Sequence, residues 1–230
     1  MRYRQISIEE QDLSEEEIFS QRLFRVYVLG LPRTGTSMMS GIVERLGVNF
    51  IANTEEEDIK AARDSQHVKK YGESYVMNEA FYEIAKDRWE RLFDVLSTPY
   101  SGCKLIIPVG PQDLALLKMQ PSRVVMMWRD PEEVRQSQQA SYKGGIIESE
   151  EEAENTRCRI NEKLCDTYTL LEENNIPVIN FKYREVLENP EEKITKLAKF
   201  INSDEDISSA VNWVNPEKNR FKEECLTRGI

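Results

Sequence analysis

The chain has 230 residues, a formal net charge of −10 and a pI near 4.9. Because phosphate backbones repel an acidic protein, this charge argues against a broad nucleic-acid or anionic-membrane surface, and an anionic ligand requires locally concentrated cations. The four cysteines form no CxxC pair and His67 is the only histidine, so the usual zinc-site spacings are excluded and we expect no structural metal.

Residues 8–22 predict an acidic helix that leads into the apolar run Phe24–Leu29, the first expected strand. After a turn, Thr36–Leu46 carries apolar side chains at helical spacing and ends at Gly47, where a helix C-cap is expected. Strand, glycine turn and helix in this order are typical of the opening of a nucleotide-binding unit.

The rest of the chain continues this alternation. The pattern assigns no element to residues 48–70 or to the tail after Ser203, but it predicts a helix over Ser74–Leu96. The run RVVMMW at Arg123–Trp128 is apolar at nearly every position, as is typical of a strand buried on both faces of a parallel sheet. The other expected elements are strands at Lys104–Ile107 and Pro177–Phe181 and helices at Leu114–Met119, after Pro131, at Glu151–Glu173 and at Pro190–Ile201.

The alternation predicts a single α/β domain over residues 1–230, with a three-layer, P-loop-type parallel sheet flanked by helices. Between two of these helices, Gly144 and Gly145 open an acidic segment that reaches Glu154, and we expect this segment to be a mobile lid. The N-terminus has no apolar signal-peptide core, and no stretch reaches the roughly 18 apolar residues of a membrane span. We therefore expect a cytoplasmic protein with reduced thiols and no membrane contact.

The segment VLGLPRTGTS, residues 28–37, has the glycine spacing of a phosphate-binding loop. Backbone N–H groups in such a turn converge on phosphate oxygens, and the following helix N-terminus adds partial positive charge. A nucleoside triphosphatase has lysine where this chain has Thr36, and here the cation lies upstream at Arg33. Because an arginine fork can bind a terminal phosphate or sulfate bidentately, the loop favours a 5'-phosphosulfate. The expected ligands are Arg33, Thr34, Gly35, Thr36 and Ser37.

A second motif, WRDPEEVRQS, covers residues 128–137. Pro131 suits the first position of a helix and Asp130 its N-cap, so Arg129 is expected at the carboxyl end of the preceding strand. Ligands of open α/β sheets bind at that edge. The motif therefore predicts a second anion contact near the phosphate loop.

Together the two motifs resemble those of the sulfotransferase family. PRTGTS, Pro32–Ser37, is similar to the family's 5'-phosphosulfate loop, and Arg129 with Ser137 resembles its pair of 3'-phosphate ligands. The resemblance implies 3'-phosphoadenosine 5'-phosphosulfate as cofactor, no metal, and a sulfotransferase that acts on a hydroxyl or amine. The acceptor class stays open among small molecules, carbohydrates and peptides, and so does the oligomeric state.

Two weaker similarities concern the end of the chain. Tyr183 resembles the family tyrosine that lies beside the adenine, although a core or interface aromatic is an equal alternative. Arg220 resembles a late basic residue that reaches the 3'-phosphate.

The resemblance fails at the family's catalytic histidine. The corresponding segment is KLIIP, Lys104–Pro108, in which Ile106 occupies the histidine position and cannot take a proton. Arg33 and Lys104 are expected to stabilise charge on the transferring group, with a structural ion pair as the alternative for Lys104.

An acceptor that loses a proton still requires a base. Other branches of the family use a glutamate in the loop after the first helix, where this chain has Glu55, and His67 is the second candidate. Ordinary surface positions are the alternative for both residues.

Two other functions remain open from the sequence. The first is a binding or scaffold protein on the same fold that lost catalysis together with the histidine. The second is a P-loop kinase, which would use Asp130 as its magnesium ligand.

Overall fold

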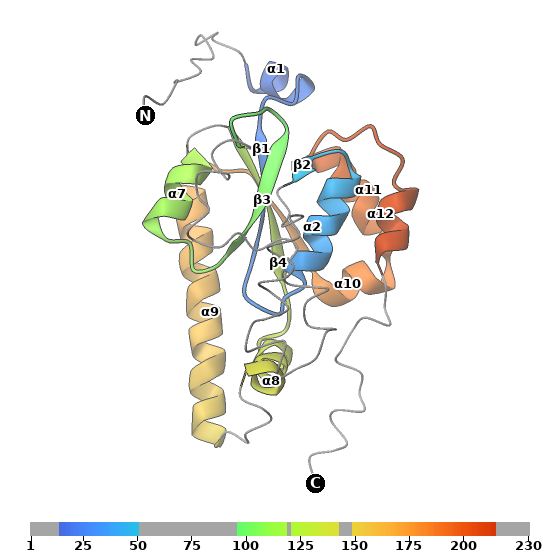
Figure 1. Ribbon diagram of the computed structural model, residues 1–230. Helices are drawn as coiled ribbons and strands as arrows, with labels where there is room; N and C mark the ends of the chain where they lie inside the picture. Colours follow the sequence, from blue (N-terminus) through green and yellow to red (C-terminus); the bar gives the residue numbers. More distant parts are fainter. Residues whose placement is uncertain (1–13, 51–95, 119–120, 143–148, 215–230) are drawn as a thin grey trace, which may run out of the picture.

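A computed structural model of the chain describes residues 14–50, 96–118, 121–142 and 149–214 (Figure 1). The candidate bases Glu55 and His67, the late Arg220 and nearly all of the helix expected at Ser74–Leu96 lie outside the described residues. The remaining predicted elements fall within them, except for residues 8–13 of the expected first helix and Met119 at the end of another.

Within the described residues, the sheet has five strands, all parallel, in the order β2-β3-β1-β4-β5. Its strands are β1 Arg25–Gly30, β2 Asn49–Phe50, β3 Ser101–Ile106, β4 Ser122–Trp128 and β5 Val178–Lys182. At the centre, Val28 of β1 lies opposite Lys104 of β3 and Val125 of β4. Because the strands are parallel, their carboxyl ends share one edge, which is at the bottom of Figure 1.

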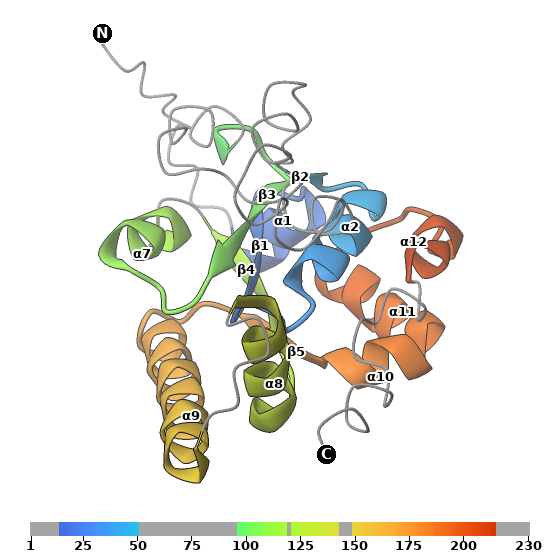
Figure 2. The ribbon, with the colours of Figure 1, turned by 60° about the horizontal axis from the view of Figure 1, so that its bottom comes forward.

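Helices cover both faces of the sheet, which confirms the predicted three-layer α/β fold (Figures 1 and 2). One face carries α2 Thr36–Arg45, α10 Tyr183–Glu188, α11 Pro190–Phe200 and α12 Ser208–Trp213. The other carries α7 Pro111–Lys118 and α9 Glu150–Glu173. The short helix α1 Glu15–Ser20 lies at the amino edge, and α8 Pro131–Tyr142 lies at the carboxyl edge.

Strand β4 joins the two hydrophobic layers. Val125 and Met127 pack in the layer of α2 and α11, whereas Val124 and Met126 pack in the layer of α7 and α9. All four side chains are fully buried, and burial of each apolar side chain of this size stabilises the fold by about 2 kcal/mol. Burial on both faces explains why this stretch of the sequence shows no alternation.

The structure corrects several predicted boundaries. Strand β3 begins at Ser101, three residues before the predicted Lys104. The prediction missed this start because Ser101, Gly102 and Cys103 are small residues without the β-branched side chains typical of strands. Only glycine fits at position 102, because the Cβ of any other residue would lie 2.1 Å from the carbonyl oxygen of Val26. Helix α7 begins at Pro111, where proline suits a first turn, and not at Leu114. The short elements β2, α10 and α12 were not predicted, since none is long enough to show a period.

The predicted lid is wrong in its second half. Helix α9 already begins at Glu150, and Ser149 and Glu152 form a reciprocal capping box in which each side chain accepts the other's backbone N–H. Residues 143–148 lie outside the described residues. None of the helices that the structure describes combines the length and apolarity that a membrane crossing demands.

Candidate functional site

The turn between β1 and α2 is tight and partly left-handed. Arg33 has φ 77° and Gly35 has φ 92°, a region that favours glycine. Thr34 holds the turn closed, since its backbone N–H and its hydroxyl both donate to the carbonyl of Leu31, at 3.2 and 2.8 Å. Thr34 is 1% exposed, so the structure gives this residue a role inside the turn.

Helix α2 starts directly from this turn. Gly35 is its N-cap, accepts the first helical hydrogen bond from Met39 at 3.1 Å, and provides no side-chain cap. A helix N-terminus of this kind directs backbone N–H groups and partial positive charge toward the carboxyl edge of the sheet. The start of α2 thus faces the same edge as Arg129.

The second motif has the local structure predicted for it. Asp130 is the N-cap of α8, and its carboxylate accepts the backbone N–H of Glu132 at 2.9 Å and of Glu133 at 3.4 Å. Arg129 therefore lies at the carboxyl end of β4, where its side chain is 7% exposed. Ser137, two turns along α8, is also buried.

The two motifs meet at the carboxyl edge. Nε of Arg33 donates to the hydroxyl of Ser137 at 3.2 Å, and Nη1 of Arg129 lies 3.5 Å from the carbonyl oxygen of Arg33. A third contact joins the segments, since Gln138 donates to the carbonyl of Pro32 at 3.1 Å. Segments about a hundred residues apart in sequence thus form one cluster of cations and hydroxyls.

Tyr183, the first residue of α10, completes this cluster. The guanidinium of Arg129 lies 4.8 Å from its ring centroid, which is cation–π distance. The ring also packs against Gly35, where a Cβ would lie 2.4 Å from Cδ2 of the tyrosine. Gly35 is therefore required both by its positive φ and by the close approach of this ring.

Lys104 approaches the phosphate turn from β3. Its Nζ donates to the hydroxyl of Ser37 at 3.3 Å, and the residue is 6% exposed. Ile106, at the end of the same strand, pairs with Gly30 of β1 and is partly buried. The structure thus brings a lysine to the turn and leaves an alkyl group at the position where the family resemblance would require histidine.

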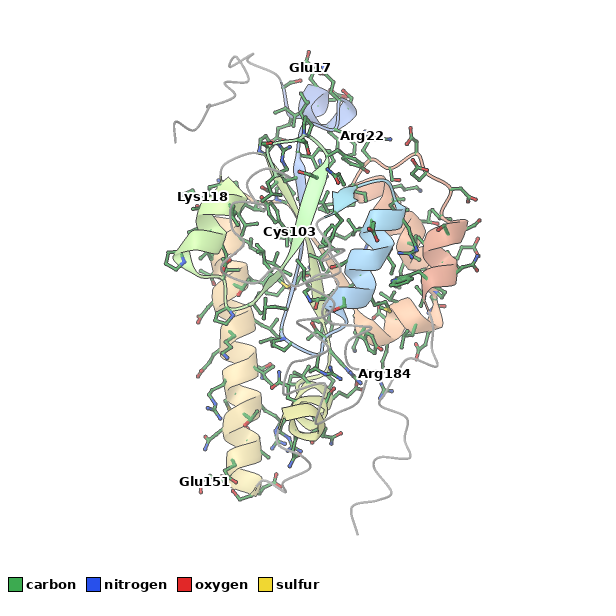
Figure 3. The ribbon with its side chains drawn as sticks, in the orientation of Figure 1. Glu17, Arg22, Cys103, Lys118, Glu151 and Arg184 are labelled. Atoms are coloured by element: carbon green, nitrogen blue, oxygen red, sulfur yellow. The ribbon has the colours of Figure 1, made fainter. Side chains whose placement is uncertain are left out.

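Two residues that sequence reasoning missed are part of the cluster. Glu133 lies 2.6 Å from Nε of Arg129 through one carboxylate oxygen and 2.6 Å from Nε of Arg184 through the other. The spacing of Glu133 four residues after Arg129 is a signal that could have identified it. Arg184 gave no such signal, because its contact joins α10 to α8 (Figure 3).

The neighbouring Glu132 belongs to a different network. It accepts hydrogen bonds from Arg135, Arg157 and Gln136, and the Arg135 bond contributes most to lowering its pKa to about 2. Arg157 lies on α9, so this ionised carboxylate ties α8 to α9. The network fixes the helix that carries Ser137.

The site combines cations and hydroxyls with the ring of Tyr183 and the carboxylate of Glu133. Among the residues that the structure describes, no group of three or more His, Cys, Asp or Glu side chains could hold a metal ion. The predicted residues Arg33, Thr34, Gly35, Thr36, Ser37, Lys104, Arg129, Ser137 and Tyr183 all lie at the carboxyl edge. This arrangement can bind an elongated polyanion.

Comparisons with known proteins agree with the architecture. By sequence, neither a family model nor a curated protein matches the chain. By structure, it is similar to mouse sulfotransferase SULT7A1 complexed with PAP, with a TM-score of 0.52 and 14% identity, over 93% of this chain and 75% of that one. At this identity the similarity concerns the fold, and the chain has the sulfotransferase fold.

Two further solved structures have lower scores. Sulfotransferase STF9 from Mycobacterium avium has a TM-score of 0.47 and 16% identity, over 93% of this chain and 77% of that one. A sugar kinase from a Janibacter species has a TM-score of 0.41 and 14% identity, over 82% of this chain and 97% of that one.

Proposed function

We propose that this protein is a sulfotransferase that transfers the sulfuryl group of 3'-phosphoadenosine 5'-phosphosulfate to a hydroxyl or amine of a small-molecule, carbohydrate or peptide acceptor. The observation that carries this proposal is the meeting of the two motifs, with Arg33 bound to Ser137 and Arg129 beside the Arg33 carbonyl. One nucleotide that is phosphorylated at both ends requires two anion sites on one edge of the sheet.

The donor set fits such a nucleotide. The phosphate turn and the N-terminus of α2 would bind the 5'-phosphosulfate, whereas Arg129 and Ser137 would bind the 3'-phosphate. Tyr183 lies between these two regions, where its ring would contact the adenine. Arg220 would add a cation to the 3'-phosphate. None of these contacts requires a metal.

The reaction requires charge stabilisation and a base. In an in-line transfer the acceptor atom attacks sulfur while the bond from sulfur to the phosphate oxygen breaks, so negative charge grows on that oxygen. Lys104 and Arg33 would stabilise this charge, and the burial of Lys104 strengthens its effect. The acceptor proton would go to Glu55, or to His67 as the second candidate.

Binding of the reaction product, adenosine 3',5'-bisphosphate, tests the proposal by calorimetry. We expect the wild-type protein to bind it, and we expect Arg33→Ala and Arg129→Ala each to weaken binding by about ten- to a hundredfold, because each removes charged hydrogen bonds to phosphate. Arg159→Ala is the matched control, since this exposed arginine contacts only its own helix turn in the described residues. Equal affinities in all four proteins would refute the assignment.

A second candidate is a nucleotide-binding protein without transferase activity. Ile106 at the histidine position favours it, because the described part of β3 offers no proton acceptor there. Incubation with radiolabelled cofactor and mixed phenol, sugar and peptide acceptors separates the two functions. A sulfated acceptor supports the transferase, whereas bisphosphate binding without a sulfated product supports the second candidate.

The kinase alternative has less support. Asp130, its suggested magnesium ligand, caps α8 through two backbone N–H groups. That use of the carboxylate is structural. The kinase alternative would be favoured instead if, in the same calorimetric assay, the protein bound magnesium-ATP more tightly than adenosine 3',5'-bisphosphate.

A further inference from the structure

The carboxylate of Glu133 already pairs with Arg129, the arginine that the proposed function assigns to the 3'-phosphate. It forms an ion pair with Nε of Arg129 at 2.6 Å, and the two side chains are 16% and 7% exposed. A partly buried carboxylate at this distance offers an arginine much the same interaction as a phosphate oxygen. The protein thus carries an anion of its own at this point.

The other proposed 3'-phosphate ligand is also engaged. The hydroxyl of Ser137 accepts a hydrogen bond from Arg33, a residue of the phosphate turn. Both side chains of the second motif therefore bind groups of the protein itself. A 3'-phosphate that binds Arg129 and Ser137 has to replace these protein contacts.

Arg184 gives the displaced carboxylate a partner. Its Nε lies 2.6 Å from the second oxygen of Glu133, and its own side chain is 61% exposed. Figure 3 shows Arg184 in the lower half of the molecule, between α8 and α10. Because an exposed, long side chain moves at little cost, Glu133 can leave Arg129 and remain paired.

We infer that Glu133 is an internal counter-anion that the 3'-phosphate of the nucleotide displaces from Arg129, while Arg184 retains the displaced carboxylate. This inference rests on the proposed function, and it concerns how strongly the site binds the 3'-phosphate. The carboxylate lowers the affinity for every anion at Arg129, the 3'-phosphate included. Glu133 thus sets how much the 3'-phosphate contributes to nucleotide binding.

The alternative role for Glu133 is to orient Arg129 for phosphate. The two roles predict opposite changes in nucleotide affinity when Glu133 is neutralised. If the carboxylate competes with phosphate, its neutralisation strengthens binding, because one negative charge beside the ligand disappears. If it orients the arginine, the same change weakens binding.

The test is calorimetric titration of wild type and Glu133→Gln with adenosine 3',5'-bisphosphate and with adenosine 5'-monophosphate. We expect Glu133→Gln to bind the bisphosphate about tenfold more tightly, the effect of one charge-assisted contact, and the monophosphate with unchanged affinity. Glu188→Gln is the control, since it removes an equal charge from an exposed position one turn after Arg184. It leaves both affinities unchanged.

A double-mutant cycle tests the part played by Arg184. Without this arginine Glu133 has only Arg129 as its partner in the described residues, so Arg184→Ala weakens bisphosphate binding in the wild-type background. In the Glu133→Gln background the same substitution has little effect. Equal weakening in both backgrounds would mean that Arg184 binds the phosphate directly, and would overturn its assigned role.

The outcomes separate this inference from the proposed function. Tighter binding of the bisphosphate alone by Glu133→Gln supports the inference. Weaker binding, or a gain that is equal for both nucleotides, overturns it and leaves the sulfotransferase proposal standing. No bisphosphate binding by either protein, with both folded by circular dichroism, overturns the two together.

Discussion

The two edges of the parallel sheet both hold arginines that are partly or fully buried, but they surround them with different partners. At the amino edge, Arg123 lies 4.2 Å from the ring centroid of Phe19 and donates to the carbonyl of Phe200 at 2.8 Å. Arg22 likewise donates to a backbone carbonyl and pairs with Asp204. Figure 3 labels Arg22 at this upper end of the molecule.

At the carboxyl edge the arginines contact a hydroxyl and a carboxylate in addition to a backbone carbonyl and a ring. Arg33 binds the Ser137 hydroxyl and Arg129 binds Glu133. A hydroxyl or a carboxylate side chain can rotate away from its arginine, whereas the backbone carbonyl and the packed rings around Arg123 cannot move without disturbing the fold. A buried arginine with exchangeable partners is therefore compatible with a ligand site, and one held as Arg123 is held is not.

Among substitutions that test the difference between the two edges, Gly35→Ala is expected to have the largest effect. The substitution forces alanine into a left-handed conformation and drives its Cβ into the Tyr183 ring, for a combined loss of about 3 kcal/mol in unfolding free energy. Urea denaturation measures the loss, and nucleotide binding should fall with it because the phosphate turn is distorted.

Gly110→Ala is the control for this substitution. A Cβ at this position would meet the carboxylate of Asp113 at 3.4 Å, which is an ordinary van der Waals contact. Equal losses of unfolding free energy in the two variants would show that neither the positive φ of Gly35 nor its contact with Tyr183 requires glycine.

Arg123→Ala is expected to have an intermediate effect. It removes a charged hydrogen bond and cation–π contacts at the amino edge, and should lower the unfolding free energy by about 2 kcal/mol. Nucleotide affinity, measured by calorimetry on the folded variant, should stay at the wild-type value. Loss of affinity comparable to that of Arg129→Ala would break the distinction between the two edges.

Glu132→Gln has the smallest expected effect and depends on pH. Because the folded pKa is lowered from 4.5 to about 2, the ionised carboxylate stabilises the fold above about pH 4.5, and this contribution fades as pH falls toward 2. After allowance for solvent screening we expect a loss of about 1 kcal/mol near neutral pH.

Urea denaturation of wild type and Glu132→Gln at about pH 6 and about pH 3 measures this dependence. The difference between the two proteins should shrink at the lower pH. A difference that stays constant would assign the effect to packing rather than to charge. Glu188→Gln again controls for the loss of one exposed carboxylate.

Local patterns were sufficient to predict much of the fold. An uninterrupted apolar run predicted β4, and Asp130 with Pro131 predicted the start of α8, because strand burial and helix capping depend on neighbouring residues. Elements without such patterns were missed, among them the short helices α10 and α12.

The order of the elements, the tight turn after β1 and the position of Arg129 at a strand end could be predicted, since each follows from local backbone chemistry. Three contacts became known only from the folded chain: Arg33 reaches Ser137, Tyr183 packs on Gly35, and Glu133 joins two arginines. Those contacts depend on which strands become neighbours in the sheet. Strand order is set by how all the segments pack together in the core. It therefore cannot be predicted from the local pattern of any one segment.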